Sequence, residues 1–154
     1  MATAIRNVNR LAAWEALIRA HATLLRALDA ELQAEQGMSA GDYDVLITLA
    51  NAPEGSLRMR ELADRVVLSR SGITRRVDRL ERDGLVRREP ATDDGRSIVA
   101  CLTDLGRERL RAAASVHVAG VEERFLGRYS DEELATIAEL LERVAEVETS
   151  CDVA

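Results

Sequence analysis

Residues 62–103 of the chain read LADRVVLSRSGITRRVDRLERDGLVRREPATDDGRSIVACLT and decide its fold. The stretch predicts a short helix, a turn, a second helix and a β-hairpin with a charged tip. In the second helix Ile73, Val77 and Leu80 recur at helical spacing and are expected to face a core. The side chains between them can donate hydrogen bonds; they are Arg70, Ser71, Thr74, Arg75, Arg76 and Arg79. An amphipathic helix with this outer face suits an anionic groove such as that of DNA.

The charge of the chain is distributed unevenly. A net charge of −6 argues at first against a nucleic-acid partner. From Arg65 to Arg88, however, eight arginines stand against Asp78, Glu81 and Asp83, a local excess of five positive charges that leaves −11 for the rest. Such asymmetry attracts an anionic partner to one region and repels it from the others. A merely solvated helix face is the alternative, and the hairpin that follows the helix argues against it.

The composition indicates one domain, or one domain with a long appendage. The chain has 154 residues, and at 47% hydrophobic it can bury a substantial core. Aromatic residues make up only 3%. Leucine, valine, isoleucine and alanine must therefore do the packing, which favours helices.

The cysteines and histidines predict neither a metal site nor a cofactor. Cys101 and Cys151 are far apart in sequence, and His21 and His117 are isolated, so a structural zinc site is not expected. There is no signal peptide, and no apolar run approaches the roughly 20 residues of a membrane span. We therefore expect a cytoplasmic protein with reduced thiols.

The two ends of the chain predict long helices with wide apolar stripes. The first helix is expected from Val8 to Gln36. Its apolar stripe is so wide that it needs more partner surface than one small domain offers. Its members are Leu11, Trp14, Leu17, Ile18, His21, Leu24, Leu25, Leu28 and Leu32. The last two helices, behind Thr103 and Ser130, have similar stripes.

Caps and breakers place the remaining elements. In chain order we first expect a helix capped by Ser39, a very short strand at Ser56-Leu57, and a poorly capped helix from Met59 to Val66. A helix capped by Ser69 and ending near Arg82 follows, and then strands over 85–89 and 96–102. The last two elements are a helix from Thr103 to about Leu126 and a helix that begins with the capping box of Ser130 and Glu133.

This order of elements resembles the winged helix-turn-helix of the MarR (multiple antibiotic resistance regulator) family of transcription factors. The motifs that carry the resemblance are Glu61–Ala63, the reading helix Ser71–Leu80, Asp83–Val86, the wing tip Asp94–Arg96, and Leu102–Gly106. The resemblance covers nearly the whole chain. It implies a mainly α fold with a small β-hairpin wing.

The resemblance also implies how the chain is organised. Residues 1–154 would form a single domain, with 38–102 as the DNA-binding part and 1–37 plus 103–154 as a helical dimerisation part. The first and the last two helices of each subunit would interlock in a homodimer. Such a dimer places two reading helices in successive major grooves of a palindromic operator, with the wings on minor grooves or backbone.

Carried over by position, the base-edge readers would be Arg70, Ser71, Thr74 and Arg75, because arginine can bind guanine O6 and N7 together. Ser69 would be a helix cap and possible phosphate donor. Arg96 would be the arginine of the wing tip, with Asp94 bracing the hairpin. For Arg79 and Arg82, phosphate contact and simple solvation both stay open.

Five residues resemble the effector site of the urate-responsive branch of the family: Trp14, His21, Asp44, Arg76 and Arg88. A small anionic aromatic compound would stack on the tryptophan, and the two arginines would bind its charge in place of Asp44. Because Arg76 belongs to the reading helix, this exchange would move that helix. Each residue also has a purely structural interpretation, as a core anchor, an interface histidine or an ion-pair partner.

Several other functions are alternatives to a ligand-responsive regulator. A cysteine-based redox switch would have to use Cys101 or Cys151, and free structural thiols fit both better. A winged helix can also serve as a protein-interaction module without a ligand. An enzyme is not expected, because no nucleophile–base pair, Gly-rich phosphate loop or metal-ligand spacing is present. A repressor is favoured over an activator, since a dimer lying across a promoter blocks polymerase by its position.

Overall fold

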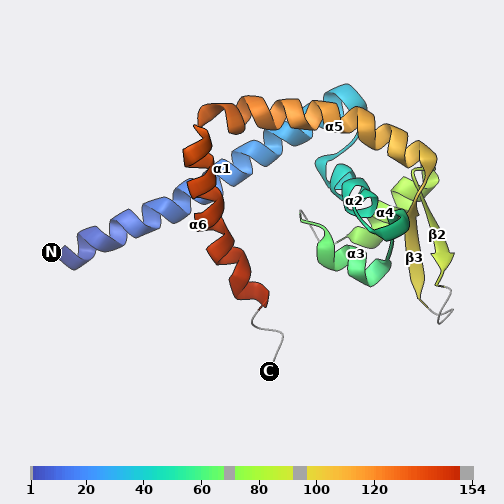
Figure 1. Ribbon diagram of the computed structural model, residues 1–154, viewed down its shortest axis with the longest axis horizontal. Helices are drawn as coiled ribbons and strands as arrows, with labels where there is room; N and C mark the ends of the chain where they lie inside the picture. The colour runs from blue at the N-terminus through green and yellow to red at the C-terminus, as the bar shows by residue number, and fades with distance from the viewer. Residues whose placement is uncertain (1, 68–71, 92–96, 150–154) are drawn as a thin grey trace. The chain divides into compact units, whose positions relative to one another are not determined.

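The computed structural model describes residues 2–67, 72–91 and 97–149, and the side chains within 11–144 of these (Figure 1). The elements are α1 (Ala2–Gln36), α2 (Ala40–Ala50), η1 (Pro53–Gly55), β1 (Ser56–Arg58), α3 (Met59–Arg65), α4 (Ile73–Arg82), β2 (Val86–Pro90), β3 (Ile98–Leu102), α5 (Asp104–Arg124), η2 (Leu126–Arg128) and α6 (Asp131–Thr149). The predicted mainly helical fold with a small β-hairpin wing is confirmed.

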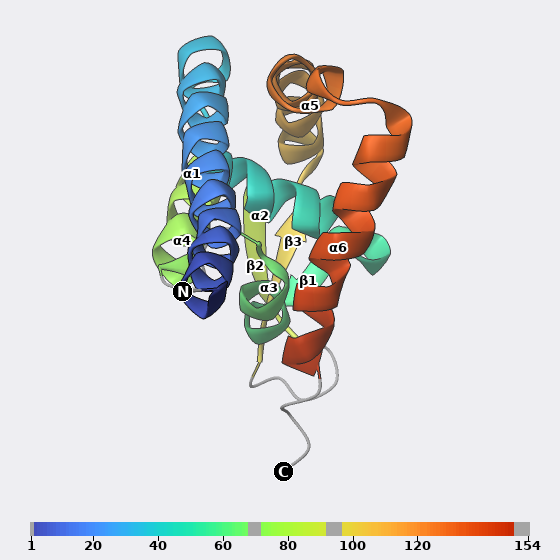
Figure 2. The same ribbon diagram turned by 90° about the vertical axis from the view of Figure 1, so that its left-hand side faces the viewer.

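The three strands form one antiparallel sheet in the order β1-β3-β2. In the hairpin, Val86 pairs with Leu102 and Pro90 with Ile98, while β1 joins the other edge of β3 through Leu57 and Ala100. Both views show α2 and α3 beside this sheet (Figures 1 and 2). The sheet and the helix-turn-helix therefore share one core.

The core is made almost entirely of aliphatic side chains, as the composition predicted. Its largest fully buried side chains are Leu32, Leu46, Leu49, Leu62, Leu80, Val45, Val77 and Val86. Ile73, Val77 and Leu80 of α4 all belong to it, which confirms the predicted inner face of that helix. Burying a side chain of this size contributes about 1.5–3 kcal/mol, so this face contributes much of what holds α4 in place.

Three of the predicted helix caps are confirmed. The Ser39 hydroxyl accepts a hydrogen bond from the Asp42 amide at 3.1 Å, and the Thr103 hydroxyl accepts one from the Gly106 amide at 2.9 Å. Ser130 and Glu133 form the reciprocal capping box at the start of α6.

Two helix starts and one helix cap differ from the prediction, and the strand bounds shift by one or two residues. The residue before α4 is Gly72, with φ of 81°, whereas Ser69 lies outside the described residues. A glycine adopts this left-handed backbone without steric cost, so it can begin the helix without a side-chain cap. The N-terminus of α3 is better capped than expected, because the Arg58 amide donates a hydrogen bond to the Glu61 carboxylate at 3.3 Å. The first helix begins at Ala2 rather than Val8, since nothing from Ala2 to Asn7 breaks it.

The chain divides into two compact units, Met1–Val118 and Ala119–Ala154. The second unit contains the end of α5, η2 and α6. Inside it the rings of Phe125 and Tyr129 meet edge to face, with centroids 5.4 Å apart. Among the described residues, no helix is long and apolar enough to cross a membrane.

Gly106 is the glycine whose replacement is expected to harm the fold most directly. A Cβ there would collide with the carbonyl oxygen of Leu85 and lie 2.7 Å from Leu102 Cδ1. We expect Gly106→Ala to lower the free energy of unfolding by about 1–3 kcal/mol, as overpacking does elsewhere. Urea denaturation followed by circular dichroism measures this. Gly37→Ala is the control, because a Cβ at Gly37 meets no atom within 4 Å and only its φ of +61° opposes the change. An unchanged midpoint for Gly106→Ala would contradict the predicted contact.

Candidate nucleic-acid interface

Helix α4 presents an exposed face opposite its buried one. Successive residues of a helix are about 100° apart, so Arg75 and Arg82 lie opposite the core side chains. Thr74, Arg75 and Arg82 are all exposed. The predicted base readers Thr74 and Arg75 therefore stand on the outer surface of the helix. The other predicted DNA contacts, Ser69, Arg70, Ser71 and Arg96, lie outside the described residues, as does Asp94.

One flank of α4 is held by the first turn of α2. The carboxylate of Asp42 accepts a hydrogen bond from Arg79 at 2.5 Å and lies 3.6 Å from the Arg76 guanidinium. Arg76 also donates to the Ser39 hydroxyl at 3.4 Å. Gly41 makes room for this approach, because a Cβ there would lie 2.5 Å from Arg76 Cζ. We call these three polar contacts, together with the close approach of Arg76 to Gly41, the α2 tie.

The other flank is held by the hairpin. The Arg88 guanidinium of β2 donates to Asp78 at 2.7 Å and to Glu81 at 2.9 and 2.5 Å, and its backbone amide donates to Glu81 at 3.0 Å. The hydrogen bond from Arg88 lowers the pKa of Glu81, and the bond to Glu81 raises the pKa of Arg88. We call these contacts the β2 tie.

The two ties contribute more to the rotational orientation of α4 about its own axis than to the stability of the fold. The side chains of Asp42 and Arg79 are 10% and 46% exposed. A partly exposed pair of this kind contributes about 1 kcal/mol or less, well below the contribution of the buried face. Rotation of α4 about its axis would, however, break contacts on both flanks at once. The outer face with Thr74 and Arg75 is thus kept outward.

The ties also change how the arginines of this region are counted. Arg76, Arg79 and Arg88 face carboxylates inside the protein, and Arg87 pairs with Glu89 at 2.6 Å. Within the described stretches, the arginines of residues 65–88 without a carboxylate partner are Arg65, Arg75 and Arg82. The local excess of positive charge seen in the sequence is therefore only partly available to an anionic partner.

The residues predicted to form an effector site lie on different elements. Trp14 and His21 are exposed on α1, and Asp44 is buried on α2 and has its own interactions. The sequence predicts a contact of the two arginines with Asp44, and the contacts described for these arginines are with other residues. Arg76 is held by Asp42 and Ser39, and Arg88 by Asp78 and Glu81. The sequence indicates Asp42 only as a helix-start residue, because local spacing does not reveal a partner 37 positions away.

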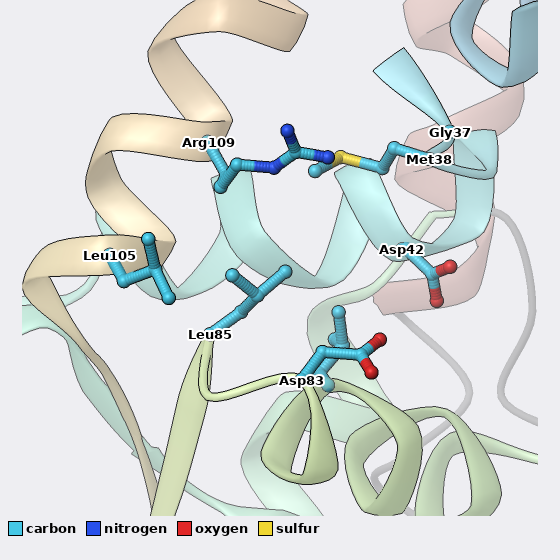
Figure 3. A pocket seen from close by; sticks show the side chains of 8 residues that line it. Gly37, Met38, Asp42, Asp83, Leu85, Leu105 and Arg109 are labelled. Carbon is cyan, nitrogen blue, oxygen red and sulfur yellow. The ribbon is translucent and has the colours of Figure 1, made fainter.

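A cavity of about 290 Å³ lies next to the α2 tie (Figure 3). Asp42 and Asp83 line one side of it, and Leu85, Leu105 and Arg109 line another. One nitrogen of Arg109 already donates to the backbone oxygen of Gln36 at 2.8 Å. The cavity therefore borders the junction of the first two helices with the C-terminal end of α4.

The described cysteine does not have the character of a redox sensor. Cys101 is 8% exposed, and burial followed by the nearby Glu89 carboxylate raises the pKa of its thiol. A raised pKa reduces the thiolate that oxidants attack. Cys151 lies outside the described residues. Among those described, no group of three or more histidine, cysteine and acidic side chains is arranged to hold a metal ion.

Comparisons with known proteins agree on one family. The MarR family profile matches residues 36–97. The transcriptional repressor YetL of Bacillus subtilis is 34% identical over 73% of this chain and 69% of its own, and the regulator PecS of Dickeya dadantii is 34% identical over 77% and 71%. Sco3205, a MarR family transcriptional regulator from Streptomyces coelicolor solved in complex with DNA, superposes with a TM-score of 0.84 at 37% identity, over 90% of this chain and 87% of that one. The chain belongs to the MarR family.

His117 is expected to make stability depend on pH. Its ring lies 4.6 Å from that of Tyr43, and its Nδ1 is buried with no hydrogen-bond partner among the described residues. Burial lowers the pKa of His117 below its ordinary 6.5, so the unfolded chain takes up the proton first. The stabilising contribution is therefore complete above pH 6.5 and is lost as the pH falls below it.

Thermal unfolding of wild type and His117→Phe between pH 7.5 and 5.5 measures this effect. The phenylalanine keeps the ring contact but cannot titrate, so we expect its melting temperature to fall less on acidification. His21→Gln, altered at an exposed position on α1, is the control and should follow wild type. Parallel curves for wild type and His117→Phe would refute the assignment.

Proposed function

We propose that this protein is a transcriptional repressor that acts in the cytoplasm, binds a palindromic operator as a homodimer and is released by a small anionic aromatic compound such as urate. The observation that carries the proposal is the outward face of α4, where Thr74 and Arg75 are exposed on a helix held from both flanks. Membership of the MarR family supports it, as do the repressor named YetL and the DNA complex of Sco3205.

The homodimer is supported by apolar side chains that each unit leaves exposed. On α1, Leu11 and Trp14 are 59% and 60% exposed, and Leu17 and Ile18 are also exposed. On α6 the exposed apolar residues are Leu140, Leu141 and Val144. Several exposed apolar side chains on one helix are typical of a surface that a protein partner covers. A second copy of the chain would cover it and would bring two α4 helices to half-sites about one DNA turn apart.

The effector proposal concerns Trp14, His21, Asp44, Arg76 and Arg88. Its best physical support is the looseness of Arg76, whose contacts with Asp42 and Ser39 are 3.6 and 3.4 Å long. An anion bound near Trp14 could displace Asp42 and Ser39 from this guanidinium, because two long contacts lose little energy when they break. Losing the Arg76 contact would weaken the α2 tie and let the outer face of α4 turn away from DNA.

Operator binding provides the first test. The probe is a fluorescent duplex from the region upstream of the coding sequence, followed by anisotropy at low salt. We expect Arg75→Ala to weaken binding by about 30-fold or more, because the homodimer loses two bidentate arginine–guanine contacts of roughly 1–3 kcal/mol each. Arg111→Ala is the matched control, because Arg111 is exposed on α5 and donates only to the backbone of its own helix.

Salt dependence distinguishes DNA binding from a protein-interaction role in the same experiment. The affinity should fall steeply as salt rises, because each neutralised phosphate releases a counterion. Absence of binding to any such duplex at low salt, or an Arg75→Ala variant equal to wild type, would count against the proposed function.

Release by the effector is tested with the bound duplex. Millimolar urate is expected to reduce binding by wild type, and Arg76→Ala should respond less because it lacks the guanidinium that receives the anion. Acetate at the same concentration and ionic strength controls for anions in general, since it has the charge without a ring that could stack on Trp14. Continued full binding of wild type at millimolar urate would remove urate from the proposal and leave the DNA-binding part intact.

A further inference from the structure

We propose that Glu81 is a positioning residue, which holds the β2–β3 hairpin at a fixed angle to α4 through Arg88 so that helix and hairpin reach DNA together. This inference rests on the proposed DNA-binding function and adds to it a residue that would not itself touch DNA. Its basis is the β2 tie, where a side chain of the reading helix binds both the backbone and the side chain of one strand residue.

The geometry of the tie is specific. One oxygen of the Glu81 carboxylate accepts the Arg88 amide at 3.0 Å. The other accepts the Nε and one terminal nitrogen of the same arginine at 2.9 and 2.5 Å. The remaining terminal nitrogen donates to Asp78 at 2.7 Å. Every nitrogen of the guanidinium is thus engaged, and planar guanidinium–carboxylate contacts fix orientation as well as distance.

The core anchors β2 chiefly at its start, whereas β3 is held further along by β1, as far as the pair of Arg58 with Val99, so β2 is the strand that needs a further restraint. Val86 is 2% exposed and its pairing partner Leu102 is 5% exposed. Toward the other end of the hairpin the side chains of Glu89, Pro90 and Ile98 are exposed. Arg88 lies between these regions, two residues beyond Val86, or about 7 Å along the strand. A bond at this position resists bending of the hairpin about its base. Such bending matters because a small angular change at the base produces the largest displacement at the outer end of the hairpin.

The connection from α4 into β2 does not provide this restraint by itself. Its middle residue is Gly84, with φ of +73°, a conformation that glycine accepts easily and that gives little side-chain packing. The hydroxyl of Thr103 donates to the Gly84 carbonyl at 2.7 Å, which secures the connection at its start but not the strand beyond it. The β2 tie is the described link between α4 side chains and the middle of β2.

The tie also assigns a role to Arg88 when no effector is bound. A DNA phosphate could capture this arginine only by displacing Glu81 and Asp78, two carboxylates that would then repel the phosphate. In the DNA-bound state Arg88 would therefore anchor the hairpin and would not contact the backbone. An effector anion that did capture Arg88 would release the hairpin from α4, in addition to any effect through Arg76.

Two duplexes of different length test the positioning role. One carries the operator with flanking base pairs that a hairpin could reach, and the other is trimmed to the part read by the two α4 helices. Wild type should bind the long duplex more tightly. For Glu81→Gln we expect the affinity for the long duplex to fall to that for the trimmed one, with the trimmed duplex bound as by wild type. The double variant Glu81→Arg with Arg88→Glu restores an ion pair and should recover part of the difference.

Controls separate positioning from folding. Glu139→Gln removes an ion pair of α6, with Arg143 at 2.7 Å, that is more exposed than the pair of Glu81 and Arg88, and it should leave the difference between the duplexes unchanged. Arg88→Lys keeps the charge but loses the planar fork, so it should behave like Glu81→Gln even if that variant folds poorly. Equal weakening on both duplexes, or none, would overturn the positioning role. Failure of wild type to bind either duplex would instead overturn the proposed function and this inference together.

Discussion

Helix α4 is held against rotation about its own axis, and the rest of the candidate interface depends on this constraint. Three aliphatic side chains bury one face of the helix and supply the larger energy. A smooth aliphatic face alone defines the direction of a helix poorly, because such contacts are not directional. Hydrogen bonds are directional, and they attach α4 to α2 on one flank and to β2 on the other. The exposed face then has a single orientation.

Charged residues have two roles in this arrangement. Some of the arginines that make the stretch look basic are used to fix the scaffold, and fewer are left to meet an anionic partner. Arg79 shows this most clearly, since it is 46% exposed yet bound to Asp42 at 2.5 Å. Charge density along a sequence therefore overestimates the charge that a reading helix offers to DNA.

The two ties differ in strength, and the difference suggests a division of labour. The β2 tie uses short contacts to all nitrogens of Arg88, whereas Arg76 in the α2 tie has only contacts of 3.4 Å or more. A competing anion meets less resistance at Arg76 than at Arg88. Loss of the Arg76 contacts, with Arg79 still bound to Asp42 and the hairpin still attached to α4, is the change that these contacts permit most easily.

The sequence by itself determined the order of the elements, the buried face of α4 and the caps formed by Ser39, Thr103 and Ser130. Each of these depends on the spacing of residues within one element, which a sequence displays directly. The tertiary structure alone decided which charges pair. Asp42 rather than Asp44 holds Arg76, and Glu81 holds Arg88, because partner choice depends on how separate elements approach one another. That approach is set by core packing and by the small side chain at Gly41, and neither can be read from local spacing.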